Sequence, residues 1–397
     1  MNAAGAPLDD HGRVALVHDW LTGYRGGEKV LDAIAGLSPR ADLYTLIHVP
    51  GSTRPTIENR RVRASWLNRL PGVEDYYRWL LPFFPGWIDR LDLSDYDLVL
   101  STSHCVAKGA RAAPGAVHVC YCHTPMRYVW DRFDDYFGHW TGPRRWLIER
   151  EAARLRHWDR ETVDRVDRWI ANSHFVRDRI LRFYEVDPDR VEVVVPPVDV
   201  ERFRPPEPAP EREDRYLAVS ALVPYKRIDH AVEACARTGR RLDVAGTGPE
   251  EAALKARVRD LGATDRIRFL GFVPDDELPG LMARRRAFLF PGIEDFGITP
   301  VESTAAGLPV VARGVGGVLD SVRDGENGVL YEGGGAEALE AALDDFEARG
   351  DVWDRRVMWT WAEGFAEGRF VERYVDVVAR AIADEGPKRT TGRDRES

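Results

Sequence analysis

Two runs of alternating strands and helices, separated by a proline-rich segment, constrain the fold of this 397-residue chain more than any other feature. Short apolar and β-branched stretches of the first run lie at 13–19, 42–46, 96–102, 116–123, 168–173 and 190–197. Those of the second run lie at 215–221, 240–246, 266–271, 286–292 and 308–313. Strands separated by helices form βαβ units with parallel sheets. We therefore expect an α/β protein with two Rossmann-like domains, whose ligands bind at the carboxyl ends of the strands.

The boundary between the two runs is marked by composition. Six of the 19 residues from 196 to 214 are proline, and such a segment cannot sit in a sheet or in a helix interior. We predict an N-terminal domain over 1–197, a stiff linker over 198–214 and a C-terminal domain over 215–366. Two amphipathic helices are expected at the end of the chain.

A long charged helix is expected at about 144–167, in the first run. Its arginines are interleaved with acidic residues, which is typical of a solvated face. The apolar residues expected to face inward are Trp146, Ile148, Leu155, Trp158, Val163 and Val166.

Composition excludes several classes of protein. The net charge of −9 argues against a nucleic-acid binder, which needs a basic surface. No apolar run approaches the roughly 18 residues of a membrane span, and the start of the chain lacks the pattern of a secretory signal. Four cysteines in so long a chain do not make a disulfide framework. We expect a reduced, cytoplasmic protein.

The strongest local pattern is an E-x7-E pair, Glu294 and Glu302, around Phe296-Gly297-Ile298-Thr299. The segment follows a strand and opens a helix, so the backbone N–H groups of 297–299 are expected to form an anion site at a helix N-terminus. Two flanking carboxylates can hold sugar or ribose hydroxyls. The alternative is a purely structural capping box in Thr299-Pro300-Val301-Glu302.

Two cations follow the first strand of the second run. Lys226 and Arg227 in SALVPYKRID lie where a helix starts. Cations beside an anion site stabilise a departing diphosphate, because charge accumulates on it as the bond to a sugar breaks. A solvated loop lysine is the structural alternative.

In the first run, a loop with Gly26 and Gly27 lies between the first strand and its helix. These glycines allow close approach of backbone to a phosphate or sugar, or simply form a tight turn. His123 lies at the end of another strand, where it either faces the site or is an ordinary structural histidine. The dinucleotide and P-loop fingerprints are missing, as are H-E-x-x-H and C-x-x-C pairs. We therefore expect neither a metal nor another cofactor.

These segments, in this order, resemble the family 4 retaining glycosyltransferases, which have the two-domain GT-B fold. EDFGITPVE is similar to the family's E-x7-E signature, SALVPYKRID to its diphosphate-binding loop and GFVPDDEL (271–278) to its base-binding loop. The resemblance covers nearly the whole chain. It implies two domains facing across a cleft, with a C-terminal helix at about 367–385 completing the N-terminal domain.

The resemblance also implies roles. Glu302 would bind the ribose, and Glu294 would contact the donor sugar. The backbone of Gly297, Ile298 and Thr299 would face the sugar and phosphates, and Phe272 would lie in the base-binding loop. Lys226 would hold the diphosphate, Gly26 and Gly27 the phosphate or acceptor side, and His123 would lie near the reacting carbon. Many members carry an arginine where this chain has Ala221, and we expect Arg227 to supply that charge.

FGITPVE together with LVPYKRID is most similar to the bacterial branch rich in GDP-mannose-dependent mannosyltransferases of surface polysaccharide assembly. The implied reaction is transfer of mannose from GDP-mannose to a lipid-linked or glycan acceptor, with the departing diphosphate helping to take the acceptor's proton. The alternatives are a UDP-sugar transferase of the same family, a sugar-nucleotide epimerase and a nucleotide-sugar-binding module without activity.

One further segment, residues 76–90, carries six aromatic residues in 15 and is interrupted by two prolines and a glycine. Aromatic, partly amphipathic segments lie in bilayer interfaces, and family members with lipid-linked acceptors use this region for membrane contact. Peripheral attachment at the inner face of a membrane is one interpretation. An aromatic subcore under a loop is the other.

Overall fold

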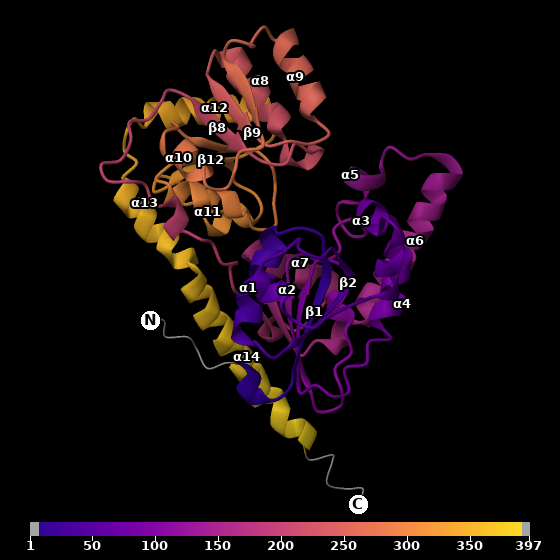
Figure 1. Ribbon diagram of the computed structural model, residues 1–397. Coiled ribbons are helices and arrows are strands. Elements are labelled where there is room, and N and C mark those ends of the chain that lie inside the picture. The colour runs from indigo at the N-terminus through magenta and orange to yellow at the C-terminus, as the bar shows by residue number, and fades with distance from the viewer. Residues whose placement is uncertain (1–7, 391–397) are drawn as a thin grey trace, which may run out of the picture. The chain divides into compact units, whose positions relative to one another are not determined.

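The computed structural model describes residues 8–390, with side chains up to 385. The chain divides into two compact units, residues 1–197 with 368–397 (unit 1) and residues 198–367 (unit 2). Each unit is built on one sheet in which every strand pairing is parallel. Each sheet is covered by helices (Figure 1).

Unit 1 has a seven-stranded sheet of order β3-β2-β1-β4-β5-β6-β7. Its strands are β1 (Val14–Leu21), β2 (Asp42–His48), β3 (Val62–Ala64), β4 (Leu98–Ser103), β5 (Val117–Cys122), β6 (Arg168–Ala171) and β7 (Val191–Val193). Its helices are α1 (Gly26–Leu37), α2 (Pro55–Glu58), α3 (Val73–Tyr76), α4 (Phe84–Ile88), α5 (Phe133–Phe137), α6 (Gly142–Glu161), α7 (His174–Tyr184) and α14 (Glu367–Thr390). The sequence pattern predicts six of these strands. The seventh, β3, is too short to show the apolar pattern of a strand.

Alternation along the strands explains the layering of unit 1. On β1, Leu16 packs with α1 and α14, whereas Val17 packs on the other face with α4 and α6. Phe370 and Tyr374 of α14 are buried in the core that contains Leu16. Helix α14 thus contributes to the core of the N-terminal unit.

Unit 2 has a six-stranded sheet of order β10-β9-β8-β11-β12-β13. Its strands are β8 (Tyr216–Val219), β9 (Leu242–Ala245), β10 (Ile267–Gly271), β11 (Phe288–Phe290), β12 (Val310–Arg313) and β13 (Gly328–Tyr331). Its helices are α8 (Ile228–Thr238), α9 (Glu251–Asp260), α10 (Leu278–Ala283), α11 (Ile298–Ala305), α12 (Ala336–Ala348) and α13 (Arg355–Ala362). The sequence pattern predicts the first five strands but neither β13 nor α12.

The proline-rich segment is more than an extended connection. Val198 bridges to Ala366, and the short 3-10 helix Glu201–Phe203 (η7) buries Phe203 completely. The segment therefore packs as part of unit 2.

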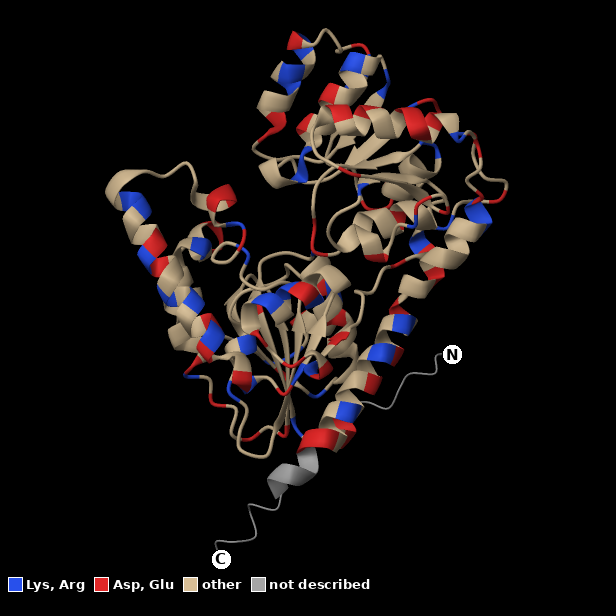
Figure 2. Cartoon of the chain, turned by 180° about the vertical axis from the view of Figure 1, so that it is seen from behind, with Lys and Arg blue, Asp and Glu red and all other residues tan. Residues whose placement is uncertain are grey.

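The long charged helix differs from expectation in two ways. Helix α6 ends at Glu161, and Val163 and Val166 are buried beyond it. Trp146, expected to face inward, is 57% exposed, whereas Leu155 and Trp158 are buried. The first turns of α6 do not lie on the core, which only the later turns cover. The alternating charges along α6 are visible in Figure 2, and Arg145 pairs with Glu149.

All four cysteines are free and buried. Among residues 8–390, no helix is long and apolar enough to cross a bilayer.

Candidate functional site

The first candidate site lies in unit 2, where β8 and β11 run side by side. Lys226 ends the short 3-10 helix Pro224–Lys226 (η8) after β8, and Glu294 follows β11. The Lys226 ammonium forms an ion pair with the Glu294 carboxylate, and both side chains are only partly exposed. A Cβ on Gly292 would lie 2.9 Å from the Lys226 carbonyl oxygen, so the two loops touch through backbone. The structure thus brings together the two predicted residues.

The segment after Glu294 leads into helix α11. Phe296 is buried, and Gly297 has a φ of 87°, which favours glycine. A Cβ there would lie 3.1 Å from the Phe290 ring. Ile298 and Thr299 are half-buried in the first turn.

The capping-box alternative is wrong. Gly297 is the N-cap residue of α11, no side chain caps the helix, and Thr299 already lies inside it. The N-cap glycine has no side chain with which to cap the first turn, and a helix N-terminus of this kind suits binding of an anion.

Glu302 lies in α11 and is 6% exposed. A guanidinium nitrogen of Arg202, from η7, lies 3.6 Å from its carboxylate, and another lies 3.2 Å from Asp275. Arg202 therefore holds Glu302 from a part of the chain that the sequence analysis treated as linker. No local pattern distinguishes this arginine from its many neighbours.

A glycine turn after β12 packs against the backbone of the Glu294 segment. A Cβ on Gly316 would lie 2.7 Å from the Glu294 carbonyl oxygen, and one on Gly317 would lie 2.1 Å from that of Asp295. The Gly317 N–H donates to the Glu294 carbonyl at 2.9 Å. The glycine-rich stretch 313–317 is visible in the sequence, but its partner segment, more than 20 residues earlier, is not.

Arg227 does not join this cluster. It has a φ of 54°, and its guanidinium bonds the Asp229 carboxylate at 2.7 and 3.0 Å. The Arg227 guanidinium, which we expected beside Lys226, is thus bonded to Asp229 and His230 instead. Phe272, in the expected base-binding loop, directly follows β10 and is 74% exposed.

The second candidate site lies in unit 1, at the carboxyl ends of β1, β4 and β5. Helix α1 begins at Gly26, and a Cβ on Gly27 would lie 3.6 Å from His123 Nε2 and 3.9 Å from His18 Cε1. The structure thus places the predicted glycines and His123 together. The Nε2 atoms of His18 and His123 are buried, and neither has a hydrogen-bond partner.

Sequence reasoning missed three side chains here, namely His18, Asp19 and His104. His18 is fully buried, and its Nδ1 lies 2.6 Å from Thr102 Oγ1. Burial lowers the pKa of His18 to about 4, and burial lowers that of His123 as well, so both imidazoles are neutral at pH 7. The His-Asp dipeptide in the second half of β1 was the available signal.

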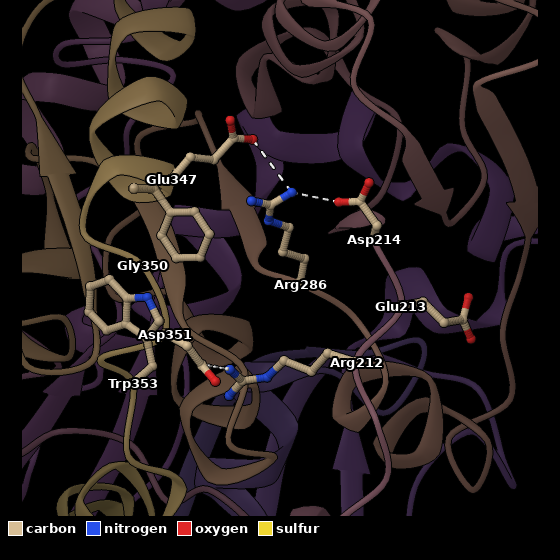
Figure 3. A pocket seen from close by; sticks show the side chains of 9 residues that line it. Arg212, Glu213, Asp214, Arg286, Glu347, Gly350, Asp351 and Trp353 are labelled. Carbon is tan, nitrogen blue, oxygen red and sulfur yellow. Dashed lines mark hydrogen bonds and ion pairs between the residues drawn. The ribbon is translucent and has the colours of Figure 1, made fainter.

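A cavity of about 330 Å³ also lies in unit 2, lined by Arg212, Asp214, Arg286, Glu347, Asp351 and other residues (Figure 3). Arg212, Glu213 and Asp214 precede β8 and Arg286 precedes β11, so this part of the lining lies at the amino ends of those strands. Arg286 pairs with Asp214 at 2.5 Å, and Arg212 pairs with Asp351 at 3.1 Å. These charges are matched within the protein, and we do not take this cavity as the functional site.

Among residues 8–390, no group of three or more histidine, cysteine, aspartate or glutamate side chains is placed to hold a metal ion.

Two known family models match this chain, and each matches a stretch that corresponds closely to one of the two units. Residues 24–202 match the family described as Glycosyltransferase Family 4, and residues 199–359 match Glycosyl transferases group 1. Each unit of the chain is thus similar to one glycosyltransferase family model. The stretch that matches family 4 contains Gly26, Gly27 and His123, and the stretch that matches group 1 contains Lys226, Glu294 and Glu302.

Curated relatives match part of this chain. A D-inositol 3-phosphate glycosyltransferase of Frankia alni is 36% identical over 198 residues, which cover 44% of this chain and 49% of the relative. A 2-deoxystreptamine glucosyltransferase of Streptomyces kanamyceticus is 39% identical over 144 residues, covering 34% of this chain and 37% of that protein. The chain spans about half the length of the first of these relatives and less of the second.

Solved structures share the whole fold. Sucrose-phosphate synthase from Thermosynechococcus elongatus superposes with a TM-score of 0.70 at 17% identity, covering 94% of this chain and 100% of that one. HepE of Anabaena in complex with UDP superposes with a TM-score of 0.69 at 16% identity, covering 93% and 100%. The two parallel-sheet domains therefore form the GT-B fold, as the sequence resemblance implied.

The glycine turn generates a prediction. Gly316→Ala pushes a methyl group against the Glu294 carbonyl, so we expect nucleoside diphosphate affinity to fall about tenfold, or about 1.4 kcal/mol. Gly325→Ala is the matched control, because its φ of 79° imposes similar strain while the nearest atom is the end of Arg349, 3.7 Å away. Titration calorimetry on both variants measures the difference. Equal affinities in the two would contradict a supporting role for the turn.

Proposed function

We propose that this protein is a retaining glycosyltransferase that moves a hexosyl group from a nucleoside diphosphate sugar to a hydroxyl acceptor. The observation that carries the proposal is the Lys226–Glu294 ion pair, held at adjacent strand ends just before the first turn of α11. A cation, a carboxylate and the first N–H groups of a helix in one place suit a charged diphosphate attached to a neutral sugar.

Each group has a distinct task in this proposal. The Lys226 ammonium stabilises the negative charge that develops on the departing diphosphate. Glu294 holds Lys226 before the donor binds and then accepts hydrogen bonds from sugar hydroxyls. Glu302, kept in place by Arg202, accepts hydrogen bonds from the ribose. Catalysis then consists of positioning and electrostatic stabilisation of an oxocarbenium-like state, for which the charges already present suffice without a metal.

The donor that we propose is GDP-mannose. Support comes from the FGITPVE and LVPYKRID segments, whose form is most similar to the mannosyltransferase branch. The exposed Phe272 ring at the end of β10 offers an aromatic face for a base. UDP-sugars are the alternative that the first experiment separates.

For the acceptor we propose a lipid-linked or polysaccharide glycan. The names of the curated relatives add a second class, small polyols such as D-inositol 3-phosphate and 2-deoxystreptamine. Both classes present a hydroxyl group, so compounds of both classes should be tested as acceptors.

A lipid-linked acceptor calls for a membrane-facing surface, and the 76–90 segment provides part of one. Tyr77 and Phe84 are buried in the core, as the subcore alternative expects, but Trp79 is 71% exposed and Phe83 59% exposed. Arg154 of α6 donates to the Pro82 carbonyl at 2.6 Å. We propose that Trp79 and Phe83 insert into the interface at the cytoplasmic face of a bilayer.

The donor proposal predicts selective stabilisation by GDP. In a thermal-shift panel of GDP, UDP, ADP and TDP, a ligand at a hundred times its dissociation constant adds about 2.7 kcal/mol, or a few degrees. We expect GDP to raise the melting temperature and the others to leave it unchanged, with or without EDTA. Stabilisation by UDP instead would overturn the donor, and no response at all would contradict the transferase.

A second prediction concerns Lys226. Lys226→Ala removes the charge that balances the diphosphate, so GDP affinity and turnover should both fall at least tenfold. Lys255→Ala is the control, since that lysine pairs with Glu251 on an exposed helix face.

Product analysis with GDP-mannose alone, then with acceptor, separates transfer from epimerisation. A new nucleotide sugar formed without acceptor would favour the epimerase.

The membrane proposal predicts co-sedimentation with vesicles that contain anionic lipid. Trp79→Ser with Phe83→Ser should release the protein, because both changes remove exposed apolar surface while sparing the buried Tyr77 and Phe84. Val352→Ser with Val357→Ser, two exposed apolar positions in unit 2, should not. Unchanged sedimentation of the aromatic double variant would contradict attachment through this segment.

A further inference from the structure

The Lys226–Glu294 ion pair joins two groups that the proposed function assigns to different parts of the donor, Lys226 to the diphosphate and Glu294 to the sugar. Both side chains are partly buried, with 17% of the lysine and 22% of the glutamate side chain exposed. An ion pair at this depth is screened less than one on an open surface. Any anion that binds the Lys226 ammonium therefore has to compete with the Glu294 carboxylate.

Backbone contacts hold both partners in place. A Cβ on Gly292 would lie 2.9 Å from the Lys226 carbonyl oxygen, so the lysine loop lies directly against the segment that leads to Glu294. On the other side of that segment, the Gly317 N–H donates to the Glu294 carbonyl at 2.9 Å. The pair therefore opens by rotation of its side chains rather than by movement of the loops.

The cation next in sequence is bonded elsewhere. The Arg227 guanidinium donates to the Asp229 carboxylate at 2.7 and 3.0 Å, and its backbone has a φ of 54°. The Lys226 ammonium instead lies 5.4 Å from the centroid of the Tyr225 ring and pairs with Glu294. An anion that binds after β8 thus depends on the ammonium that Glu294 also holds.

A nucleotide sugar and a nucleoside diphosphate differ in what they offer to the displaced carboxylate. Sugar hydroxyls donate hydrogen bonds, and an ionised carboxylate accepts them. A nucleotide sugar therefore provides new partners for Glu294 when its diphosphate takes Lys226. A nucleoside diphosphate has no such hydroxyls, and its terminal phosphate carries about one more negative charge at neutral pH. It leaves the carboxylate without a cation and next to an anion, which is unfavourable.

We propose that Glu294 exchanges the Lys226 ammonium for sugar hydroxyls, and that this exchange makes the site prefer a nucleotide sugar to the nucleoside diphosphate that remains after transfer. Once the sugar has left, the carboxylate pairs with Lys226 again and the nucleoside diphosphate dissociates. This inference rests on the proposed glycosyl transfer. It adds a role in ligand selection and product release to the sugar contact that the sequence resemblance implied for Glu294.

The experiment compares Glu294→Gln with wild type by titration calorimetry, using GDP and GDP-mannose as one pair of ligands and UDP and UDP-glucose as the other. Glutamine keeps the length of the side chain but has no charge to pair with an ammonium. The dissociation constant of the nucleoside diphosphate should fall about tenfold, or about 1.4 kcal/mol. That of the nucleotide sugar should stay within about threefold, because the amide also bonds hydroxyl groups.

Glu294→Ala is the second variant, and it separates the two halves of the exchange. It should bind the nucleoside diphosphate more tightly than wild type, as Glu294→Gln does, because the ammonium is free. It should bind the nucleotide sugar more weakly than Glu294→Gln does, because alanine offers no partner to the sugar hydroxyls. Unchanged affinity of both variants for the nucleoside diphosphate would contradict competition for Lys226.

A double-mutant cycle with Lys226→Met provides the readout that a structural role of Glu294 would not move. Without the ammonium, the carboxylate has no cation to exchange. The gain in nucleoside diphosphate affinity from Glu294→Gln should therefore shrink to about twofold in the Lys226→Met background. A double variant that binds the nucleoside diphosphate as tightly as Glu294→Gln alone would contradict the exchange.

Glu302→Gln is the contrasting variant, because the proposed function assigns Glu302 to the ribose, which both ligands carry. Both affinities should fall by the same factor, so the preference should remain. Glu251→Gln is the matched control, because Glu251 pairs with Lys255 at 2.6 Å and both side chains are partly exposed on α9. It should leave both affinities unchanged. A loss of preference in either variant as large as that in Glu294→Gln would contradict a specific role of Glu294.

Two outcomes distinguish this inference from the proposed function. A Glu294→Gln protein that melts as wild type does and keeps the wild-type preference would overturn the inference alone. A wild-type chain that binds neither pair of ligands would overturn the proposed function, and this inference with it.

Discussion

Parallel pairing of every strand is the constraint on which the rest of the structure depends. In a parallel sheet all carboxyl ends meet at one edge, so residues far apart in the sequence come together after each strand. In unit 2 this brings Lys226, which follows β8, to Glu294, which follows β11. In unit 1 it brings Asp19 to residues 104–107, more than 80 positions later. Both candidate sites are consequences of the same geometry.

Position in the fold also decides what a charged residue does. Lys108 and Lys226 are two of only five lysines in the chain. Lys108 is 1% exposed, pairs with Asp159 at 3.0 Å and bonds Thr162 at 2.7 Å, all inside the core of unit 1. Lys226 follows a strand at the edge of the sheet, and its ion-pair partner Glu294 lies at the same edge. A buried, fully paired lysine serves the fold, whereas a partly exposed one can exchange its partner for a ligand.

Much of this was predictable from the sequence, because its signals are local. Periodicity predicted eleven of the thirteen strands among residues 8–390, and glycine, lysine and glutamate at strand ends indicated the candidate site segments. The failures involve partners distant in sequence or contacts between elements. Arg202 reaches Glu302 from the supposed linker, and Asp19 depends on a loop that only strand pairing brings near. Trp146 fits an inward pattern, but the first turns of α6 have no core to cover.

The central claim is that the edge of unit 2 containing Lys226, Glu294 and the glycine turn binds a nucleoside diphosphate sugar. Hydrogen exchange measured by mass spectrometry, with and without the stabilising nucleotide sugar, tests it most directly. The account predicts slower exchange in 224–228, 294–302 and 314–317. It predicts no change around the charged cavity at 212–214 and 351–353. Protection confined to that cavity, or none in the three segments despite binding, would contradict the account.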